Sequence, residues 1–165
     1  MNNALTPQRA PSVTVEAIGH GRKIVIDAIG APAVLIFAGR ETSDAAPPIV
    51  DSIRAKYPMA SQVVIANVAD VRGIPRFVRK VAQTMMKSSY NKALDRLEPG
   101  KTPGEYVLIL PDWDGTVMTP LGIDDVSKSV AIAVIDAKGN VVGTYQGIDA
   151  AARALSLLDQ ARDAH

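Results

Sequence analysis

The sequence predicts an α/β fold with a central mixed sheet, helices on both faces of the sheet, an N-terminal β-hairpin and a long helical insert. Three observations support this fold class. Two continuous apolar runs, at 33–38 and 62–68, are typical of strands that are buried on both faces. Apolar residues at helical spacing follow each of these runs. Finally, β-rich runs on either side of short turns, near both ends of the chain, indicate hairpins.

The first half of the chain is expected to form a hairpin and two buried strands with a helix between them. In chain order these elements are Val13–Ile18, Lys23–Ile26, Ala33–Ala38, a helix that ends before Pro58, and Gln62–Val68. The hairpin is indicated by a glycine-rich turn at 19–22. The helix is indicated by Ile49, Ile53 and Tyr57, which recur at helical spacing. Ser43 or Asp44 is expected to cap its first turn, near Pro47 and Pro48.

The second half is expected to form the insert, a short strand, a second hairpin and a final helix. In chain order these elements are Arg76 to about Leu97, Tyr106–Leu110, Ala131–Ile135, Val141–Tyr145 and Asp149–Ala161. The sequence contains no internal repeat and no long linker. We therefore expect residues 1–10 to be a disordered lead and residues 11–165 to be a single domain, with the insert at about 72–101.

Composition limits the chemistry of this chain. It has 165 residues, a formal net charge of +1 and no cysteine. Without cysteine it has no thiol nucleophile, disulfide, thiolate metal site or iron–sulfur cluster. No apolar run reaches the length of about 18 residues that a transmembrane helix needs, and the N-terminus lacks a secretory pattern. We expect a cytoplasmic location and no transmembrane segment, and no motif calls for a cofactor.

Three segments resemble the redoxin branch of the thioredoxin-like superfamily, which includes the peroxiredoxins and other AhpC-TSA-like proteins. The segments read PSVTVEAIGHGRKIVI, AVLIFAG and SVAIAVIDAKGNVVGTYQG, and the resemblance extends from about Pro11 to Ala161. It implies a thioredoxin-like fold in which the last segment forms an edge hairpin before the terminal helix. An antioxidant or oxidoreductase activity would be implied by this resemblance alone.

The active-site segment of that family is degenerate in this chain. Peroxiredoxins place Pro-x-x-x-Thr-x-x-Cys after the buried strand, and the matching positions here are Ala38, Thr42 and Ala45, with Ser43 beside the threonine. Only the threonine is retained. The family's cis-proline, which precedes the strand 131–135, is also missing, and Ser129 lies at that place. The resemblance therefore implies a non-catalytic, cysteine-free relative.

An acidic pair provides an enzymatic alternative. The segment from Val107, VLILPDWDGTV, resembles the first motif of haloacid-dehalogenase-type phosphatases. In that motif Asp112 would be the nucleophile and Asp114 the general acid/base, with Mg²⁺ neutralising the phosphate charge. The remaining fifty or so residues lack the further strands of such enzymes. A turn in which these aspartates accept backbone N–H groups is the competing interpretation.

The insert is strongly basic. Residues 72–101 carry a net charge of +6, which leaves −5 for the rest of the chain. The candidate interaction face consists of Arg76, Arg79, Lys80 and Lys87. An apolar stripe of the same helix consists of Ile74, Phe77, Val78, Val81 and Met85. We expect this stripe to be buried either against its own sheet or against a partner. The basic face is either solvated surface or a contact for an anionic ligand or protein, and the scarcity of aromatic residues argues against nucleic acid.

The leading hypothesis is a non-catalytic, thioredoxin-like domain that acts by binding a ligand or protein. Its expected contact surfaces are residues 39–45 with 127–130, and the helical insert. One alternative is a Mg²⁺-dependent phosphoryl-transfer enzyme that uses Asp112 and Asp114. Another alternative is a structural subunit of a homo-oligomer.

Overall fold

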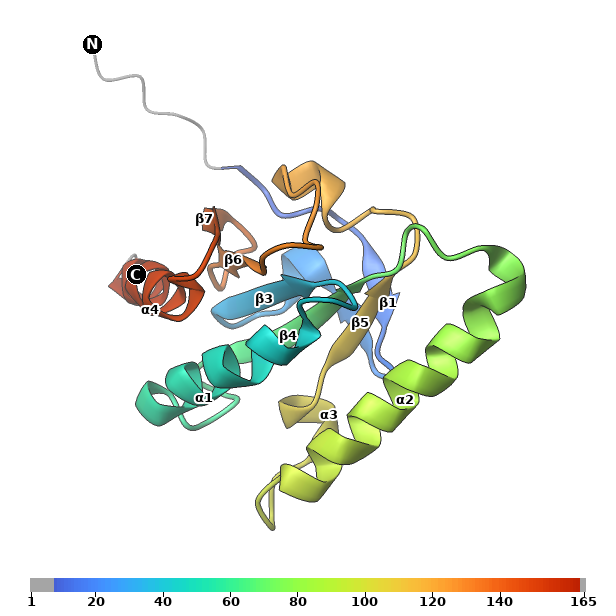
Figure 1. The fold of residues 1–165 in the computed structure, drawn as a ribbon. Coiled ribbons are helices and arrows are strands. Elements are labelled where there is room, and N and C mark those ends of the chain that lie inside the picture. Colours follow the sequence, from blue (N-terminus) through green and yellow to red (C-terminus); the bar gives the residue numbers. More distant parts are fainter. Residues whose placement is uncertain (1–7, 164–165) are drawn as a thin grey trace.

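A computed structural model describes residues 8–163 and contains a five-stranded sheet and a separate two-stranded hairpin (Figure 1). The strands are β1 Thr14–Glu16, β2 Lys23–Val25, β3 Ala33–Ala38, β4 Val64–Asp70, β5 Ile109–Asp112, β6 Ala131–Ile135 and β7 Val141–Gln146. The helices are α1 Ala46–Lys56, α2 Arg79–Arg96, α3 Pro103–Tyr106 and α4 Ala150–Asp163. Single 3₁₀ turns are η1 Ile26–Ala28, η2 Ser43–Ala45, η3 Arg76–Val78 and η4 Thr119–Leu121.

The large sheet is mixed, and its strand order is β5-β4-β3-β6-β7. β3 lies at its centre, parallel to β4 and antiparallel to β6. β5 extends the parallel side and β7 the antiparallel side. The hairpin of β1 and β2 is antiparallel and belongs to no larger sheet. The expected fold class is therefore confirmed, including the mixed sheet and the N-terminal hairpin.

The central position of β3 follows from its composition, because the side chains of residues 33–37, on both of its faces, are apolar and fully buried. Val34 and Ile36 pack on one face with Ile53 of α1 and Leu158 of α4. The expected core face of α1 is confirmed, since Ile49, Ile53 and Tyr57 are all buried. α1 and α4 lie side by side over this face of the sheet (Figure 1).

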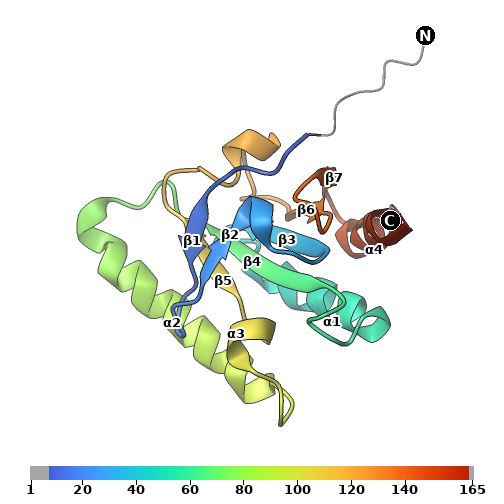
Figure 2. The same ribbon diagram turned by 180° about the vertical axis from the view of Figure 1, so that it is seen from behind.

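The second face of the sheet is covered mainly by the hairpin, which lies in front of it in Figure 2, and by η1 and η4. Leu35 and Phe37 of β3 pack there against Ile26 of η1, Leu121 of η4 and Val117. The long helix α2 lies beyond β5, beside the hairpin turn (Figure 2). Its contact with that turn sets which side of α2 is buried.

Several element boundaries differ from those expected. β4 begins two residues later than predicted, because residues 59–62 form a turn closed by the Gln62 N–H and the Met59 carbonyl at 2.9 Å. Tyr106 belongs to α3 and not to a strand, because Pro103 and Gly104 start a helical turn there. The expected capping of α1 by Ser43 or Asp44 is wrong. No side chain caps α1, whose first turn contains prolines that have no N–H to satisfy.

Residues 8–10, which were expected to belong to a disordered lead at 1–10, are ordered against the rest of the chain. Residues 1–7 lie outside the described part of the chain. Arg9, however, forms a β-bridge with Asn140, and the Ala10 N–H donates to the Gly139 carbonyl at 2.9 Å. Ala10 is buried, so residues 8–10 are fixed against the β6–β7 turn. Within residues 8–163, no helix is both long and apolar enough to cross a membrane.

Candidate functional site

In the degenerate active-site segment, the Thr42 side chain forms hydrogen bonds that link this segment to a second loop. The Thr42 hydroxyl accepts the Gly39 N–H at 2.9 Å and donates to the Val126 carbonyl at 2.7 Å. Ala38 ends β3, so this hydroxyl joins the loop after β3 to the loop before β6. In the redoxin pattern these two loops hold the cysteine and the cis-proline. Here they are joined by one side chain that carries no redox chemistry.

The other residues of this segment do not form a catalytic group. Ser43 donates its hydroxyl proton to the Arg40 carbonyl at 3.2 Å, so no general base is hydrogen-bonded to it. Ala45 is exposed just before α1. Near Ser129, the Gln146 side chain donates to the Ser129 carbonyl at 3.2 Å, and no cis peptide bond occurs between residues 8 and 163. These contacts position the backbone of both loops.

An arginine fixes the same loop to the neighbouring strand. The Arg72 Nε lies 2.9 Å from Asp70 Oδ1 at the end of β4, and the guanidinium also donates to the Asp124 carbonyl. The hydrogen bond with Asp70 raises the pKa of Arg72. The loop at 124–126 is therefore tied to the ends of both β3 and β4, which leaves little freedom for an opening between them.

The two aspartates of the phosphatase-like motif differ in their burial and in their contacts. Asp112 is 2% exposed, and its carboxyl oxygens accept the N–H groups of Val117 at 3.3 Å and Met118 at 2.9 Å. Asp114 has a side chain 77% exposed and lies 3.8 Å from Arg79. The Asp112 carboxyl therefore organises the turn that follows β5. Within residues 8–163, no group of three or more histidine or acidic side chains is arranged to hold a metal ion.

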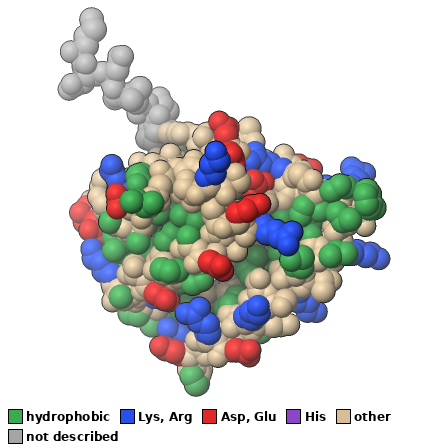
Figure 3. Space-filling view, viewed as in Figure 1, with side chains coloured by type: hydrophobic (Ala, Val, Ile, Leu, Met, Phe, Trp, Pro, Cys, Tyr) green, Lys and Arg blue, Asp and Glu red, His purple; other side chains and the backbone are tan. Residues whose placement is uncertain are grey.

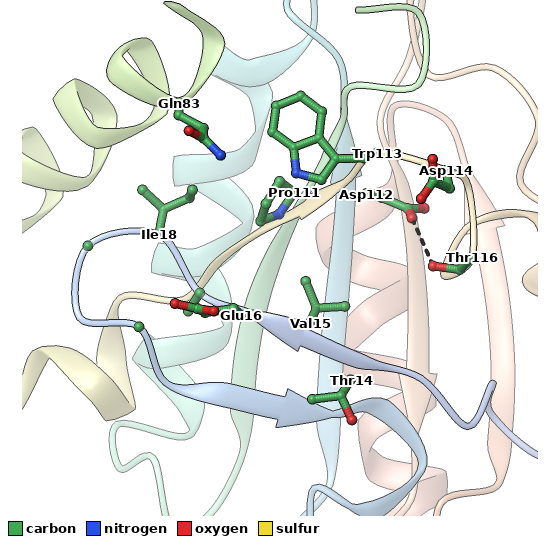
Figure 4. A pocket seen from close by; sticks show the side chains of 13 residues that line it. Thr14, Val15, Glu16, Ile18, Gln83, Pro111, Asp112, Trp113, Asp114 and Thr116 are labelled. Atoms are coloured by element: carbon green, nitrogen blue, oxygen red, sulfur yellow. Dashed lines mark hydrogen bonds between the residues drawn. The ribbon is translucent and has the colours of Figure 1, made fainter. Parts of the chain in front are cut away.

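An open pocket of about 500 Å³ lies beside that turn, between the hairpin, α2 and the end of β5 (Figure 4). Glu16 and Ile18 line it from the hairpin, Gln83 from α2, and Trp113 from the turn. The Arg79 guanidinium lies 4.9 Å from the centre of the Trp113 ring. Sequence reasoning missed this pocket, because its walls are separated by up to a hundred residues. Pro111, directly after the predicted strand Tyr106–Leu110, was the available signal of an irregular edge.

The inner side of α2 packs against the hairpin turn. Tyr90 is buried over Gly19, which has a φ of +89°, and a Cβ at that position would come within 2.4 Å of the Tyr90 ring. His20 packs beside Tyr90 with ring centres 5.7 Å apart, and its Nε2 lies 2.9 Å from the Val107 carbonyl oxygen. These contacts fix the rotation of α2 about its own axis.

The opposite side of α2 and the preceding η3 turn carry apolar side chains that are largely exposed to solvent. Phe77, Val81 and Met85 are 87%, 61% and 54% exposed, and we call these three residues the apolar face. Figure 3 shows hydrophobic and basic side chains together over this part of the molecule. Three of the five residues of the expected stripe are therefore exposed, whereas Ile74 and Val78 are half-buried.

The four basic residues of the candidate interaction face separate into two groups. Arg76, Lys80 and Lys87 are exposed, and their spacing places them together along one side of the apolar face. Arg79 differs from the other three because it turns toward the pocket, where it contacts Trp113 and Asp114. The basic surface beside the apolar face thus consists of Arg76, Lys80 and Lys87.

Comparison with known proteins identifies the fold. No family model and no curated protein matches the sequence. Among solved structures, the chain is similar to a thioredoxin-family thiol:disulfide interchange protein from Chlorobium tepidum, with a TM-score of 0.61, 15% identity, and 94% of this chain and 97% of that chain covered. It is also similar to the exposed lipoprotein thioredoxin Etrx1 from Streptococcus pneumoniae, with a TM-score of 0.59, 20% identity, and 90% and 99% covered.

A third similar structure is StoA from Bacillus subtilis, with a TM-score of 0.57, 18% identity, and 90% of this chain and 98% of that chain covered. At these identities the similarity establishes the fold. The expected thioredoxin-like fold is confirmed, and this chain has that fold with no cysteine in its sequence.

Proposed function

We propose that this chain is a binding domain on a thioredoxin-like fold, that it works without thiol chemistry, and that it binds an acidic protein through the apolar face and its basic border. The observation that carries the proposal is the exposure of Phe77, Val81 and Met85 on one side of the insert. Burying a large apolar side chain contributes about 1.5–3 kcal/mol. Three such side chains beside one another therefore favour association with a complementary surface.

Charge favours an acidic partner. Arg76, Lys80 and Lys87 border the apolar face, and residues 72–101 carry a net charge of +6. A concentrated positive surface raises the rate of encounter with an acidic protein, and this attraction is screened over about 8–10 Å at physiological salt. The apolar centre with a charged rim also matches the general composition of protein interfaces.

A non-catalytic role is supported by the absence of every cysteine and by the use of Thr42 as a bridge between loops. A dithiol or peroxidatic mechanism needs a thiolate, which this chain cannot supply. We expect the purified protein neither to reduce insulin disulfides nor to consume hydrogen peroxide with a thiol donor. Turnover in either assay, with contaminants removed, would contradict this part of the proposal. The cytoplasmic location stays a prediction.

The partner surface can be tested by photo-crosslinking in the native cells. A benzophenone amino acid replaces Val81 in one version and Ile148 in a control version, since Ile148 is 97% exposed but lies outside the insert. We expect one adduct from position 81, none of equal yield from position 148, and loss of the adduct when Arg76, Lys80 and Lys87 are changed to Glu. The captured protein is identified by mass, purified, and its Kd is measured against the charge-reversed variant across a salt series.

Two outcomes would argue against an acidic partner. An adduct of twice the chain mass would identify a second copy as the occupant and favour the homo-oligomer alternative. Equal adducts from positions 81 and 148, or an adduct that the charge reversals do not affect, would mean that this face is ordinary solvated surface.

A further inference from the structure

A pocket that the proposed function does not use has the size of a small-molecule site. It has a volume of about 500 Å³ and lies between the hairpin, α2 and the turn after β5 (Figure 4). β1 packs beside β5 and is joined to it by the hydrogen bond from the Ile18 N–H to the Ile109 carbonyl at 2.9 Å, and the pocket lies further along both segments. Ligand pockets commonly have volumes of about 300–1,000 Å³, so this one has room for a small molecule.

Part of the pocket lining is apolar. Val15 of β1, Pro111 of β5 and the Trp113 side chain contribute to it, and in the view of Figure 4 they lie between Glu16 and Asp114. Trp113 is half-buried, so part of its indole ring is accessible from the pocket. An aromatic ring provides a large apolar contact surface for the hydrocarbon part of a ligand.

The charged side chains that line the pocket are all acidic. They are Glu16 on the hairpin and, on the other wall, Asp112 and Asp114. Glu16 is exposed and makes no ion pair within residues 8–163. Asp114 has a side chain 77% exposed and lies 3.8 Å from Arg79, which is beyond hydrogen-bond distance. Two carboxylates, one on each wall, therefore have oxygens that can accept hydrogen bonds from a positively charged ligand.

We propose that this pocket binds an aliphatic diamine, with one ammonium group at Glu16, the other at Asp114 and the hydrocarbon chain against Trp113. A single exposed carboxylate attracts cations only weakly. Two carboxylates on opposite walls, with apolar side chains between them, select a ligand that carries a charge at each end of an apolar chain. Gln83 places the pocket on a different side of α2 from the apolar face, so this proposal and the proposed function can fail separately.

Trp113 is the only tryptophan in the sequence, so tryptophan fluorescence reports directly on the pocket. The probes are α,ω-diaminoalkanes with three to eight carbons, and the controls are the uncharged α,ω-diols of the same lengths. We expect the diamines to change Trp113 emission saturably at millimolar concentration, with the tightest binding at the chain length that spans the two carboxylates. The diols are expected to bind about tenfold more weakly, because they lose both charge contacts.

Three variants that each remove one negative charge test the contacts. Glu16→Gln and Asp114→Asn are each expected to weaken diamine binding several-fold and to abolish the preference for one chain length, because only one ammonium group then meets a carboxylate. Glu41→Gln is the matched control, since Glu41 is exposed on the loop after β3 and outside the pocket. It should bind diamines as the wild type does. The NMR signals of the Trp113 indole and the Gln83 side-chain amide provide a second measurement.

Three results would overturn the proposal. The first is that every diamine leaves both the Trp113 emission and the two NMR signals unchanged. The second is that diols bind as tightly as diamines, which would mean that charge plays no part in recognition. The third is that Glu41→Gln weakens binding as much as Glu16→Gln does, which would show that the total charge of the protein, and not the pocket, attracts the amines.

Discussion

The carboxyl ends of β3 and β5 lie at the same end of the sheet with β4 between them, and different side chains hold the segments that follow them. After β3, the Thr42 hydroxyl links two loops through two hydrogen bonds. After β5, the buried Asp112 carboxyl accepts two backbone N–H groups of a single turn. The first arrangement links the loop after β3, where the redoxin pattern places a cysteine, to the loop before β6. The second builds a rigid turn and leaves an open pocket beside it. Thr42 therefore closes the loop region after β3 by joining it to a second loop, whereas Asp112 joins parts of one turn and leaves the pocket beside it open.

Loss of Asp112 should have the largest effect on stability. Asp112→Ala leaves the buried N–H groups of Val117 and Met118 without acceptors, so we expect the free energy of unfolding to fall by about 3 kcal/mol. Asp112→Asn retains one acceptor oxygen and should cost less. Urea denaturation measures both. Nearly equal stability of wild type and Asp112→Ala would contradict the turn role, and a Mg²⁺-dependent phosphatase activity that Asp112→Asn abolishes would favour the enzymatic alternative.

Loss of the Thr42 hydroxyl should have a smaller effect, because fewer and more exposed groups lose their partners. Thr42→Val keeps the shape of the side chain and removes both hydrogen bonds, so we expect a loss of about 1 kcal/mol by urea denaturation. Ser43→Ala is the matched control, since its hydroxyl makes one exposed hydrogen bond at 3.2 Å. If the two variants lose the same stability, Thr42 has no special role in joining the loops.

The smallest effect concerns an ion pair far from both strand ends, between α1 and α4. Asp159 accepts hydrogen bonds from Lys56 Nζ at 2.7 Å and from the Tyr57 hydroxyl at 2.5 Å, and these bonds lower the pKa of Asp159. A carboxyl whose pKa is lower in the folded state stabilises the protein above its unfolded pKa of about 3.9, and this contribution is lost as the pH falls through the folded pKa.

The same carboxylate raises the pKa of Tyr57, so the contribution of Tyr57 is present below a pH of about 10 and is lost as the pH rises through the higher folded pKa. Asp159→Asn should flatten both slopes in a series of urea midpoints against pH. Asp51→Asn is the control, because Asp51 meets Arg96 only at 3.7 Å on the surface. Identical pH profiles for wild type and Asp159→Asn would show that this cluster contributes nothing measurable.

The sequence by itself determined the central strand, the hairpins and the absence of thiol chemistry. A run of six apolar residues such as Ala33–Ala38 has only one stable place in an α/β domain, buried on both faces, whatever surrounds it. The glycine turn at 19–22 and the aspartate-to-asparagine turn at 136–140 are likewise local signals, because their conformations depend on adjacent residues. The missing cysteines needed no structure at all.

Only the tertiary structure decided which face of α2 is buried and where the pocket beside β5 lies. Helical spacing groups Phe77, Val81 and Met85 together, but it cannot tell whether that face turns inward. The packing of Tyr90 on Gly19, seventy residues earlier in the chain, turns it outward. Likewise, the pocket is lined by the hairpin, α2 and the turn after β5, which lie far apart in the sequence. Both features are set by contacts between segments that local sequence patterns treat as independent.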